Sequence, residues 1–212
     1  AATEAIEAGL RLLVLITEGI PVHTTMRIRA RVEAAGARLI GPATPGVITP
    51  EGCKVGIMPA RFFQSGPIGV VSRSGTLSYE VSAQLSAAGL GQSTVVGLGA
   101  DAVVGTDVVD LLRLFDADTE TEAVVLVGEV GGNQEERAAR FAAHEMHTPL
   151  VAYVAGQCAV TGVPMGHAGA LVREGSGTVT DKINAFETAG VQVARSPGCV
   201  VEAVQSLMSS PT

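Results

Sequence analysis

The stretch GPIGVVSRSGTLSYEVSAQLSA, residues 66–87, decides the fold expected for this chain. Its apolar run at 67–72 predicts a β-strand, and the following residues predict a helix over 76–88. Leu77, Val81 and Leu85 are spaced four apart, which places them on one face of that helix. A strand that leads directly into an amphipathic helix is the repeating unit of an α/β sheet.

The same alternation continues to the end of the chain. Further strands are predicted at 94–98, 123–127, 150–155 and 191–194, and further helices at 107–115, 133–146, 179–189 and 197–208. The runs AVVLV and LVAYVA are apolar on both faces, as in a parallel sheet that is covered by helices on both sides. The predicted fold class is therefore α/β, with a doubly wound parallel sheet.

The residues before this sheet are organised differently. A strand at 11–17, a helix at 22–35 and a strand at 38–40 are predicted there, and three prolines predict an irregular segment over 41–52. We expect residues 1–50 to be the carboxy-terminal remnant of a Rossmann-like domain, 51–65 a linker and 66–212 the main domain. A Rossmann-like domain begins with a strand and a glycine-rich turn, and neither precedes Arg11, so the chain is expected to begin within that domain. So small a remnant is expected to be poorly stable alone or to be stabilised by packing on its neighbour.

Composition narrows the function classes. The 212 residues are 47% apolar and 17% charged, which argues against a disordered chain, and no apolar run reaches the ~18 residues of a membrane span. A net charge of -7 and 3% aromatic residues argue against nucleic-acid binding. The three cysteines show no metal-ligand or disulfide spacing, and no signal peptide is visible. A cytoplasmic protein without a metal site is expected.

Three loops fall at the carboxyl ends of predicted strands, where α/β sheets place their ligands. In the first, Ser74, Gly75 and Thr76 open a helix, whose free amides could cradle a phosphate, although Ser74 or Thr76 could equally be a simple helix cap. In the second, Glu129 ends an apolar strand; it could cap the next helix, but Asn133 suits that role better and would leave Glu129 free to orient a neighbouring group.

The third loop, MGHAGA at 165–170, places His167 between small residues. A single histidine in a loop is usually a surface residue, yet imidazole is also the side chain best suited to act as nucleophile and leaving group near neutral pH. A phosphate cradle, a carboxylate and a histidine on one sheet edge together favour phosphoryl transfer through a phosphohistidine.

Several longer motifs add a family resemblance, which covers the chain from residue 1 to about residue 207. They are ITEGIP at 16–21, PGVITPEGCKVGIMP at 45–59, GVVSRSGTLSYE at 69–80, GLGQST at 89–94, TEAVVLVGEVGGN at 121–133 and MGHAGA. In this order the motifs resemble the alpha subunit of succinyl-CoA synthetase (succinate–CoA ligase). The resemblance implies a flavodoxin-like ligase domain that follows a partial CoA-binding domain.

The resemblance also implies site roles. His167 corresponds to the histidine that is phosphorylated on Nε2, and Glu129 to the glutamate that holds it. Ser74, Gly75 and Thr76 open the helix that stabilises the phosphate, Tyr79 lies at the substrate site, and Ile16, Thr17 and Glu18 form a CoA-contacting segment. The implied substrates are succinate, CoA and phosphate. The implied partner is an ATP-grasp beta subunit, which would hold ATP or GTP (or the corresponding diphosphate) with Mg²⁺.

The sequence departs from the family pattern in four places. GPATPG replaces GPNCPG at 41–46, GAD replaces GGD at 99–101, Val163-Pro164 replaces a basic run, and 173–177 differs from GGKG. These departures leave two alternatives to a succinate–CoA ligase subunit: a ligase for malate or acetate, and a non-catalytic pseudo-subunit that has lost CoA binding.

Overall fold

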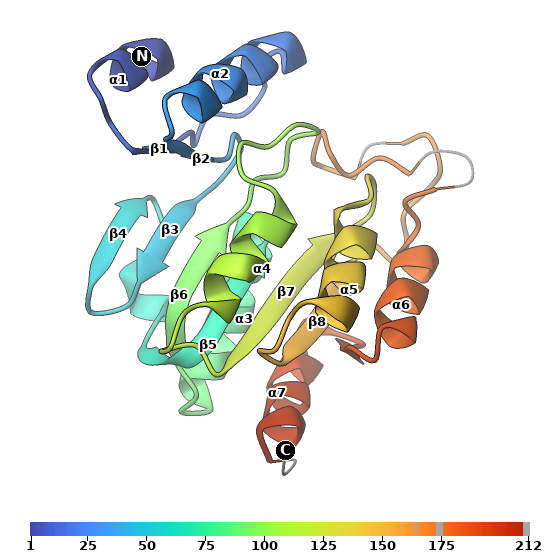
Figure 1. Ribbon diagram of the computed structural model, residues 1–212. Helices are drawn as coiled ribbons and strands as arrows, with labels where there is room; N and C mark the ends of the chain where they lie inside the picture. The colour runs from blue at the N-terminus through green and yellow to red at the C-terminus, as the bar shows by residue number, and fades with distance from the viewer. Residues whose placement is uncertain (164, 173–175, 210–212) are drawn as a thin grey trace.

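The structure is a computed structural model, and it describes residues 1–163, 165–172 and 176–209. Within that part of the chain, strands β3 to β9 form one sheet in the order β4-β3-β6-β5-β7-β8-β9 (Figure 1). The strands are β3 (Gly46–Thr49), β4 (Cys53–Gly56), β5 (Ser65–Ser72), β6 (Gln92–Gly97), β7 (Ala123–Glu129), β8 (Leu150–Ala155) and β9 (Gln192–Ala194). Strands β5 to β9 are mutually parallel, whereas β3 and β4 are antiparallel to their neighbours.

Helices cover both faces of this sheet. Helices α4 (Val108–Asp116), α5 (Gln134–His144) and α6 (Val179–Thr188) lie on one face, and α3 (Gly75–Ala87) and α7 (Val200–Ser209) lie on the other. Two single turns, η1 (Ala60–Phe62) and η2 (Pro197–Cys199), precede α3 and α7 along the chain. Because side chains alternate along a strand, Val71 joins the core under α4 while Val70 joins the core under α3. The prediction of an α/β fold with a mostly parallel sheet is confirmed.

The first forty residues form a separate small layer, which we call the N-terminal module. It consists of α1 (Ala2–Glu7), β1 (Leu12–Val14), α2 (Val22–Ala34) and β2 (Arg38–Ile40), with β1 and β2 paired in parallel. Its core contains Leu13, Val32 and Leu39. The module is attached to the larger part by the loop after β6: the Thr106 hydroxyl donates to the Leu39 carbonyl at 2.7 Å. The expected dependence of residues 1–50 on the rest of the chain for stability stays a prediction.

The segment 41–65 differs from its prediction. Residues 46–49 and 53–56 were expected to be irregular chain and linker, but they form the β3–β4 hairpin, which joins the larger sheet through β6. The prolines were misleading because Pro45 and Pro50 flank β3 and remove no hydrogen bond inside it. Gly46 and Gly56 let the two strands approach, since a Cβ at Gly46 would lie 2.1 Å from the Val55 carbonyl oxygen. The division of the chain into functional domains stays a prediction.

All five parallel strands point their carboxyl ends toward the N-terminal module (Figure 1). The loops that follow β5, β6, β7 and β8 therefore gather at one edge, between the sheet and the module. None of the helices in the described residues is long and apolar enough to cross a membrane. The sheet edge under the module is the place at which the predicted site residues can meet.

Candidate active site

The structure brings together the two side chains at the centre of the predicted site. His167 Nδ1 lies 2.8 Å from Glu129 Oε2, although the two residues are 38 positions apart in the sequence. Glu129 is the last residue of β7, and His167 lies in the long loop after the neighbouring strand β8. The side chain of Glu129 is 7% exposed and that of His167 is 33% exposed, so a buried carboxylate holds an accessible imidazole.

This contact determines which ring nitrogen can react. A carboxylate only accepts hydrogen bonds, so the Glu129 contact requires a proton on His167 Nδ1. In the neutral ring the other nitrogen, Nε2, then keeps its lone pair. Glu129 therefore favours the tautomer in which Nε2 is the nucleophile, and it also stabilises positive charge that develops on the ring during attack.

A buried arginine sits behind the glutamate. Arg73 Nη2 lies 3.2 Å from Glu129 Oε1, an ion pair in which both side chains are almost fully buried. Arg73 Nη1 also donates to Glu135 Oε1 at 3.0 Å, and Glu135 is paired in turn with Lys182. Burial alone would lower the pKa of Arg73, but Glu135 and Glu129 outweigh that influence and raise it. The arginine therefore stays charged behind the Glu129 carboxylate.

A cavity of about 230 Å³ opens beside the imidazole. Residues from each part of the predicted site line it. Ile16 and Glu18 come from the segment predicted to contact CoA, Gly75, Thr76 and Tyr79 come from α3, and His167 comes from the loop after β8. The turn after β2 and the loop after β6 supply most of the other walls, namely Ala43, Thr44, Pro45 and Ala100. The segment predicted to contact CoA, the helix predicted to bind phosphate and the predicted phosphohistidine therefore border one cavity. Their individual roles stay predictions.

Two predicted residues contribute from outside the cavity wall. Ser74 is the N-cap of α3, where its hydroxyl accepts from the Leu77 amide at 3.4 Å. Thr17 contributes its carbonyl, which accepts from the Ala43 amide at 3.1 Å and thereby holds the turn at 41–45. Ser74 is thus a helix cap, as one of the two interpretations of this loop predicted. The first helical residues, Gly75 and Thr76, line the cavity.

Tyr79 borders the cavity one turn into α3. Its ring packs on Phe62 and Phe63, each with ring centroids 6.2 Å away. Burial raises the pKa of the Tyr79 phenol. The phenol therefore stays protonated at neutral pH and can donate a hydrogen bond into the cavity.

Two of the departures from the family pattern, Thr44 and Ala100, have structural roles. The Thr44 hydroxyl donates to the Gly97 carbonyl at 2.5 Å and accepts from the Gly46 amide at 3.0 Å, so it fixes the turn beside the cavity. Ala100 joins two loops through its backbone: its amide donates to Ala43 at 3.2 Å, and its carbonyl accepts from the Gly169 amide at 2.9 Å. Pro164 and the segment 173–175 lie outside the described residues.

Sequence reasoning missed two aspects of the site. Asn133 occupies the N-cap position of α5, but its side chain makes no capping hydrogen bond, so the reason given for releasing Glu129 is wrong. Glu129 is instead held by Arg73, to which no role was assigned. Asp101 also stands near the site, and burial followed by the negative charge of Glu18 raises the pKa of its carboxyl.

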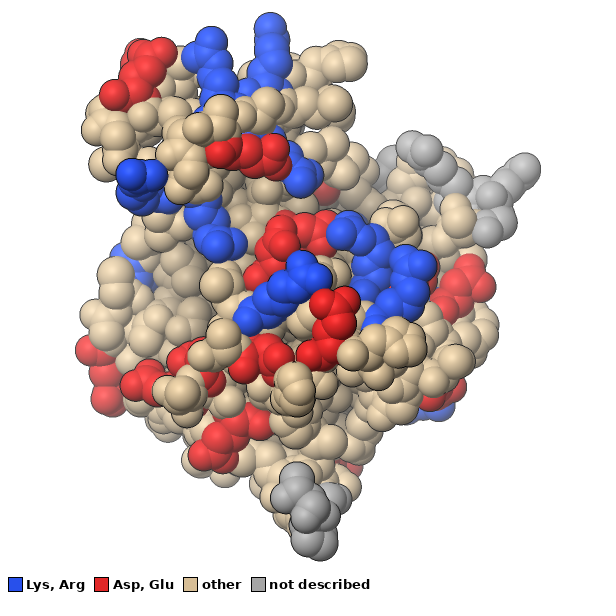
Figure 2. All heavy atoms as spheres, in the orientation of Figure 1, with Lys and Arg blue, Asp and Glu red and all other residues tan. Residues whose placement is uncertain are grey.

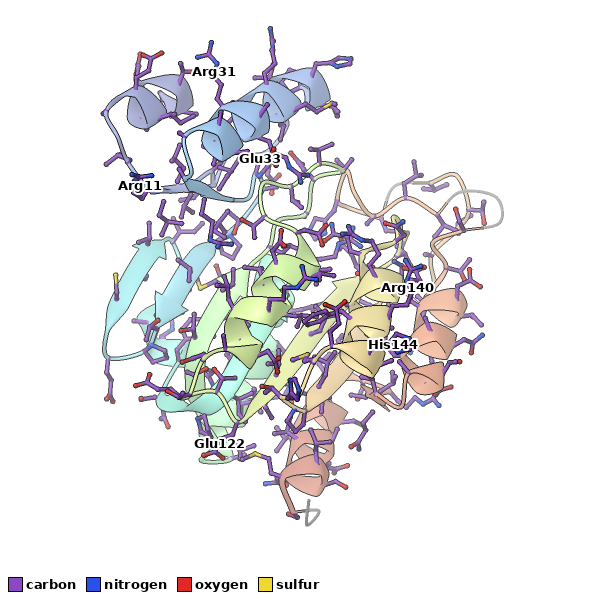
Figure 3. All side chains as sticks on the ribbon, in the orientation of Figure 1. Arg11, Arg31, Glu33, Glu122, Arg140 and His144 are labelled. Carbon is purple, nitrogen blue, oxygen red and sulfur yellow. The ribbon has the colours of Figure 1, made fainter. Side chains whose placement is uncertain are left out.

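Other charged groups lie away from the site. His144 ends α5 at the end of the helix that points away from the N-terminal module (Figure 3). His147 Nδ1 lies 3.4 Å from Asp116 Oδ2, at the same far end of the sheet. In Figure 2 the basic side chains lie mainly over the upper half and centre of the face shown, whereas its lower left carries mostly acidic side chains. Within the described residues, no group of three or more His, Cys, Asp or Glu side chains could hold a metal ion.

Comparison with known proteins points to one family. The model of the CoA-ligase family matches residues 71–192. The chain is 52% identical over 208 residues to the ADP-forming succinate–CoA ligase subunit alpha 2 of Archaeoglobus fulgidus, an alignment that covers 98% of this chain and 72% of the relative. It is 47% identical over 210 residues to the ADP-forming succinate–CoA ligase subunit alpha of Aquifex aeolicus, covering 98% of this chain and 69% of the relative.

Solved structures share the fold. A Methanosaeta concilii ATP citrate lyase in complex with (3S)-citryl-CoA superimposes with a TM-score of 0.89 at 28% identity, over 97% of this chain and 36% of the lyase chain. The chain thus spans about a third of that lyase. A dinucleotide-forming acetyl-coenzyme A synthetase of Ca. Korarchaeum cryptofilum superimposes with a TM-score of 0.78 at 23% identity, over 99% of this chain and 46% of the synthetase chain. With near-complete coverage of this chain and about half of its residues identical to those of the curated relatives, the chain belongs to the succinate–CoA ligase alpha-subunit family.

Proposed function

We propose that this chain is the alpha subunit of a succinate–CoA ligase that transfers a phosphoryl group through His167. The observation that carries the proposal is the 2.8 Å contact between His167 Nδ1 and Glu129 Oε2 beside a cavity shared with Ile16, Thr76 and Tyr79. The contact leaves Nε2 as the reactive nitrogen, and His167 lines the same cavity as Gly75 and Thr76, whose amides would bind a phosphate.

The proposed reaction has three steps. Phosphate attacks the thioester carbon of succinyl-CoA, CoA leaves as the thiol, and succinyl phosphate forms. His167 Nε2 then attacks the phosphorus, the P–O bond to succinate breaks, and free succinate leaves. In the last step a terminal phosphate oxygen of a nucleoside diphosphate attacks the phosphohistidine, which restores the neutral imidazole and gives the triphosphate. Glu129 supports the first attack on phosphorus because the ring becomes positively charged.

The residues of this chain supply the electrostatics of these steps. Gly75 and Thr76, the first residues of α3, line the cavity, and their amides at the positive end of the helix would stabilise the oxygens of the phosphoryl group. Tyr79 can donate a hydrogen bond to the acid or to the phosphate. Ile16 and Glu18 approach the same space from the N-terminal module, which suits a bound CoA whose thiol reaches the cavity.

A second subunit would complete the site. The His167 imidazole is one-third exposed, and three apolar side chains of the same loop are exposed as well: Val160, Val163 and Met165. Exposed apolar side chains in the loop of a reactive group favour a protein partner that excludes water. We propose a beta subunit as this partner. It would hold the nucleoside diphosphate, and the Mg²⁺ bound there would neutralise phosphate charge. A cytoplasmic location is part of the proposal.

The substrate acid is tested by comparison. With the chain assembled with its beta subunit, CoA ester formation would be measured with succinate, malate and acetate, and with ADP or GDP as acceptor in the reverse direction. We expect succinate to give the highest kcat/KM, and a higher value with malate or acetate would identify a related ligase. A complex that binds CoA but leaves His167 unphosphorylated by labelled ATP would instead identify a non-catalytic pseudo-subunit.

A further inference from the structure

Arg73 joins three loops around the candidate site. It lies between β5 and α3 and is 3% exposed. Its Nη1 donates to the carbonyls of Glu129 and Gly131 at 3.1 and 3.0 Å, and its Nη2 donates to the carbonyl of Gly169 at 3.3 Å. One planar guanidinium therefore holds the loop of the glutamate and the loop of the histidine in a fixed relation.

The arginine also holds the glutamate side chain itself. Glu129 Oε2 accepts from His167, whereas Glu129 Oε1 is buried and has only the 3.2 Å ion pair with Arg73 Nη2 among the described residues. If the Arg73 charge is removed, the buried Glu129 carboxylate loses its counter-ion, and the contact that keeps Oε2 directed toward the imidazole is lost. Gly169 lies two residues after His167, so the same loss releases the histidine loop.

We propose that Arg73 is a positioning residue for phosphoryl transfer: it fixes Glu129 and the Gly169 carbonyl together, so that Nδ1 of His167 stays on Glu129 and Nε2 stays directed to the cavity. This inference rests on the proposed function of His167. The close packing of the histidine loop on the arginine supports it, because a Cβ at Gly169 would already lie 3.1 Å from Arg73 Nη2.

The far side of the network provides a matched control. Lys182 is fully buried and is paired with Glu135 and, at 3.2 Å, with Glu136, and it donates to the Gly132 carbonyl at 3.2 Å. Within the described residues it makes no hydrogen bond or ion pair with Glu129 or with the histidine loop. A change at Lys182 therefore breaks the same buried network without touching the groups that orient the imidazole.

The test compares Arg73→Met with Lys182→Met. The tautomer of His167 is read by ¹⁵N NMR of the full chain labelled at histidine, with the His167 signals assigned by their loss in His167→Asn. Kinetics are measured on the complex with the beta subunit. We expect Arg73→Met to lose the preference for a proton on Nδ1 and to lower kcat on the order of 100-fold, with little change in the KM for CoA. Lys182→Met should lower thermal stability yet keep the wild-type tautomer.

The outcomes separate the two proposals. A wild-type tautomer and kcat in Arg73→Met, or an equal loss of tautomer preference in Lys182→Met, would overturn the positioning role. If Arg73→Met does not fold, Arg73→Lys decides. A compact ammonium cannot span the acceptors in the loop after β7 and in the loop after β8, so we expect the same loss, and wild-type behaviour would refute the proposal. Absence of phosphate on His167 in the wild-type complex would defeat the proposed function itself, whatever the variants show.

Discussion

Replacing Glu129 with glutamine removes the charge that holds His167. It also ends the buried ion pair of Glu129 with Arg73, whose guanidinium keeps its pair with Glu135. The bond lost is a charge-assisted contact of 2.8 Å with a buried carboxylate, which is worth about 1.5–3 kcal/mol. Since about 1.4 kcal/mol corresponds to a factor of ten in rate, Glu129→Gln should slow phosphorylation of His167 by roughly 10-fold to 150-fold. The effect should fall on the chemical step, because Glu129 does not line the cavity.

The assay is a single turnover. The assembled complex is mixed with labelled ATP, quenched in alkali, and the phosphohistidine is counted against time. Glu136→Gln is the control, since Glu136 is a nearby glutamate that is paired with Lys182 and makes no hydrogen bond with His167 within the described residues. A Glu129→Gln rate within twofold of wild type, or an equal loss in Glu136→Gln, would refute the reasoning that the carboxylate fixes the reactive tautomer.

Three further substitutions test the surrounding structure. Glu135→Gln should cost about 3 kcal/mol in urea unfolding at pH 7; because its cationic partners hold the pKa of Glu135 below its ordinary 4.5 despite burial, the difference should shrink as the pH falls below about 4.5, and an unchanged difference at pH 4 would contradict this. Gly169→Ala would place a Cβ 2.8 Å from the Ala100 carbonyl oxygen, so it should reduce phosphate labelling of His167 while it changes the melting temperature little. Gly198→Ala is the control, because a Cβ there meets nothing closer than 3.8 Å. Gly105→Ala would place a Cβ 2.3 Å from Leu39 and should lower the free energy of unfolding by about 1–3 kcal/mol, which calorimetry would measure. No loss would show that the N-terminal module can shift away from the loop after β6 without cost.

The main sheet could be predicted from the sequence because each of its central strands is a short apolar run followed by a helix. Residues 67–72 and 123–127 fall inside β5 and β7, and the helix expected at 76–88 is α3 within one residue at each end. The β3–β4 hairpin was not predictable in this way. Its strands are four residues long and lie among prolines and glycines, and their pairing with β6 depends on contacts remote in sequence.

The site was predictable where topology alone places residues together. Glu129 ends β7 and the loop of His167 follows the adjacent parallel strand β8, so their meeting follows from the strand order. The support of that pair was not predictable. Arg73 stands in a loop of small residues and has no local mark of burial, and its partner Glu135 is 62 positions away. Such a network becomes visible only when the loops of several strands are packed against one another.

The nitrogen that carries the phosphate provides the most direct test of the central claim. The complex would be phosphorylated with ATP after labelling of this chain with ¹⁵N-histidine, and coupling between phosphorus and nitrogen would identify the bonded atom. Since Glu129 engages Nδ1 at 2.8 Å, we expect the phosphoryl group on Nε2 of His167. Phosphate on Nδ1, or on any residue other than His167, would contradict the catalytic role assigned to this pair.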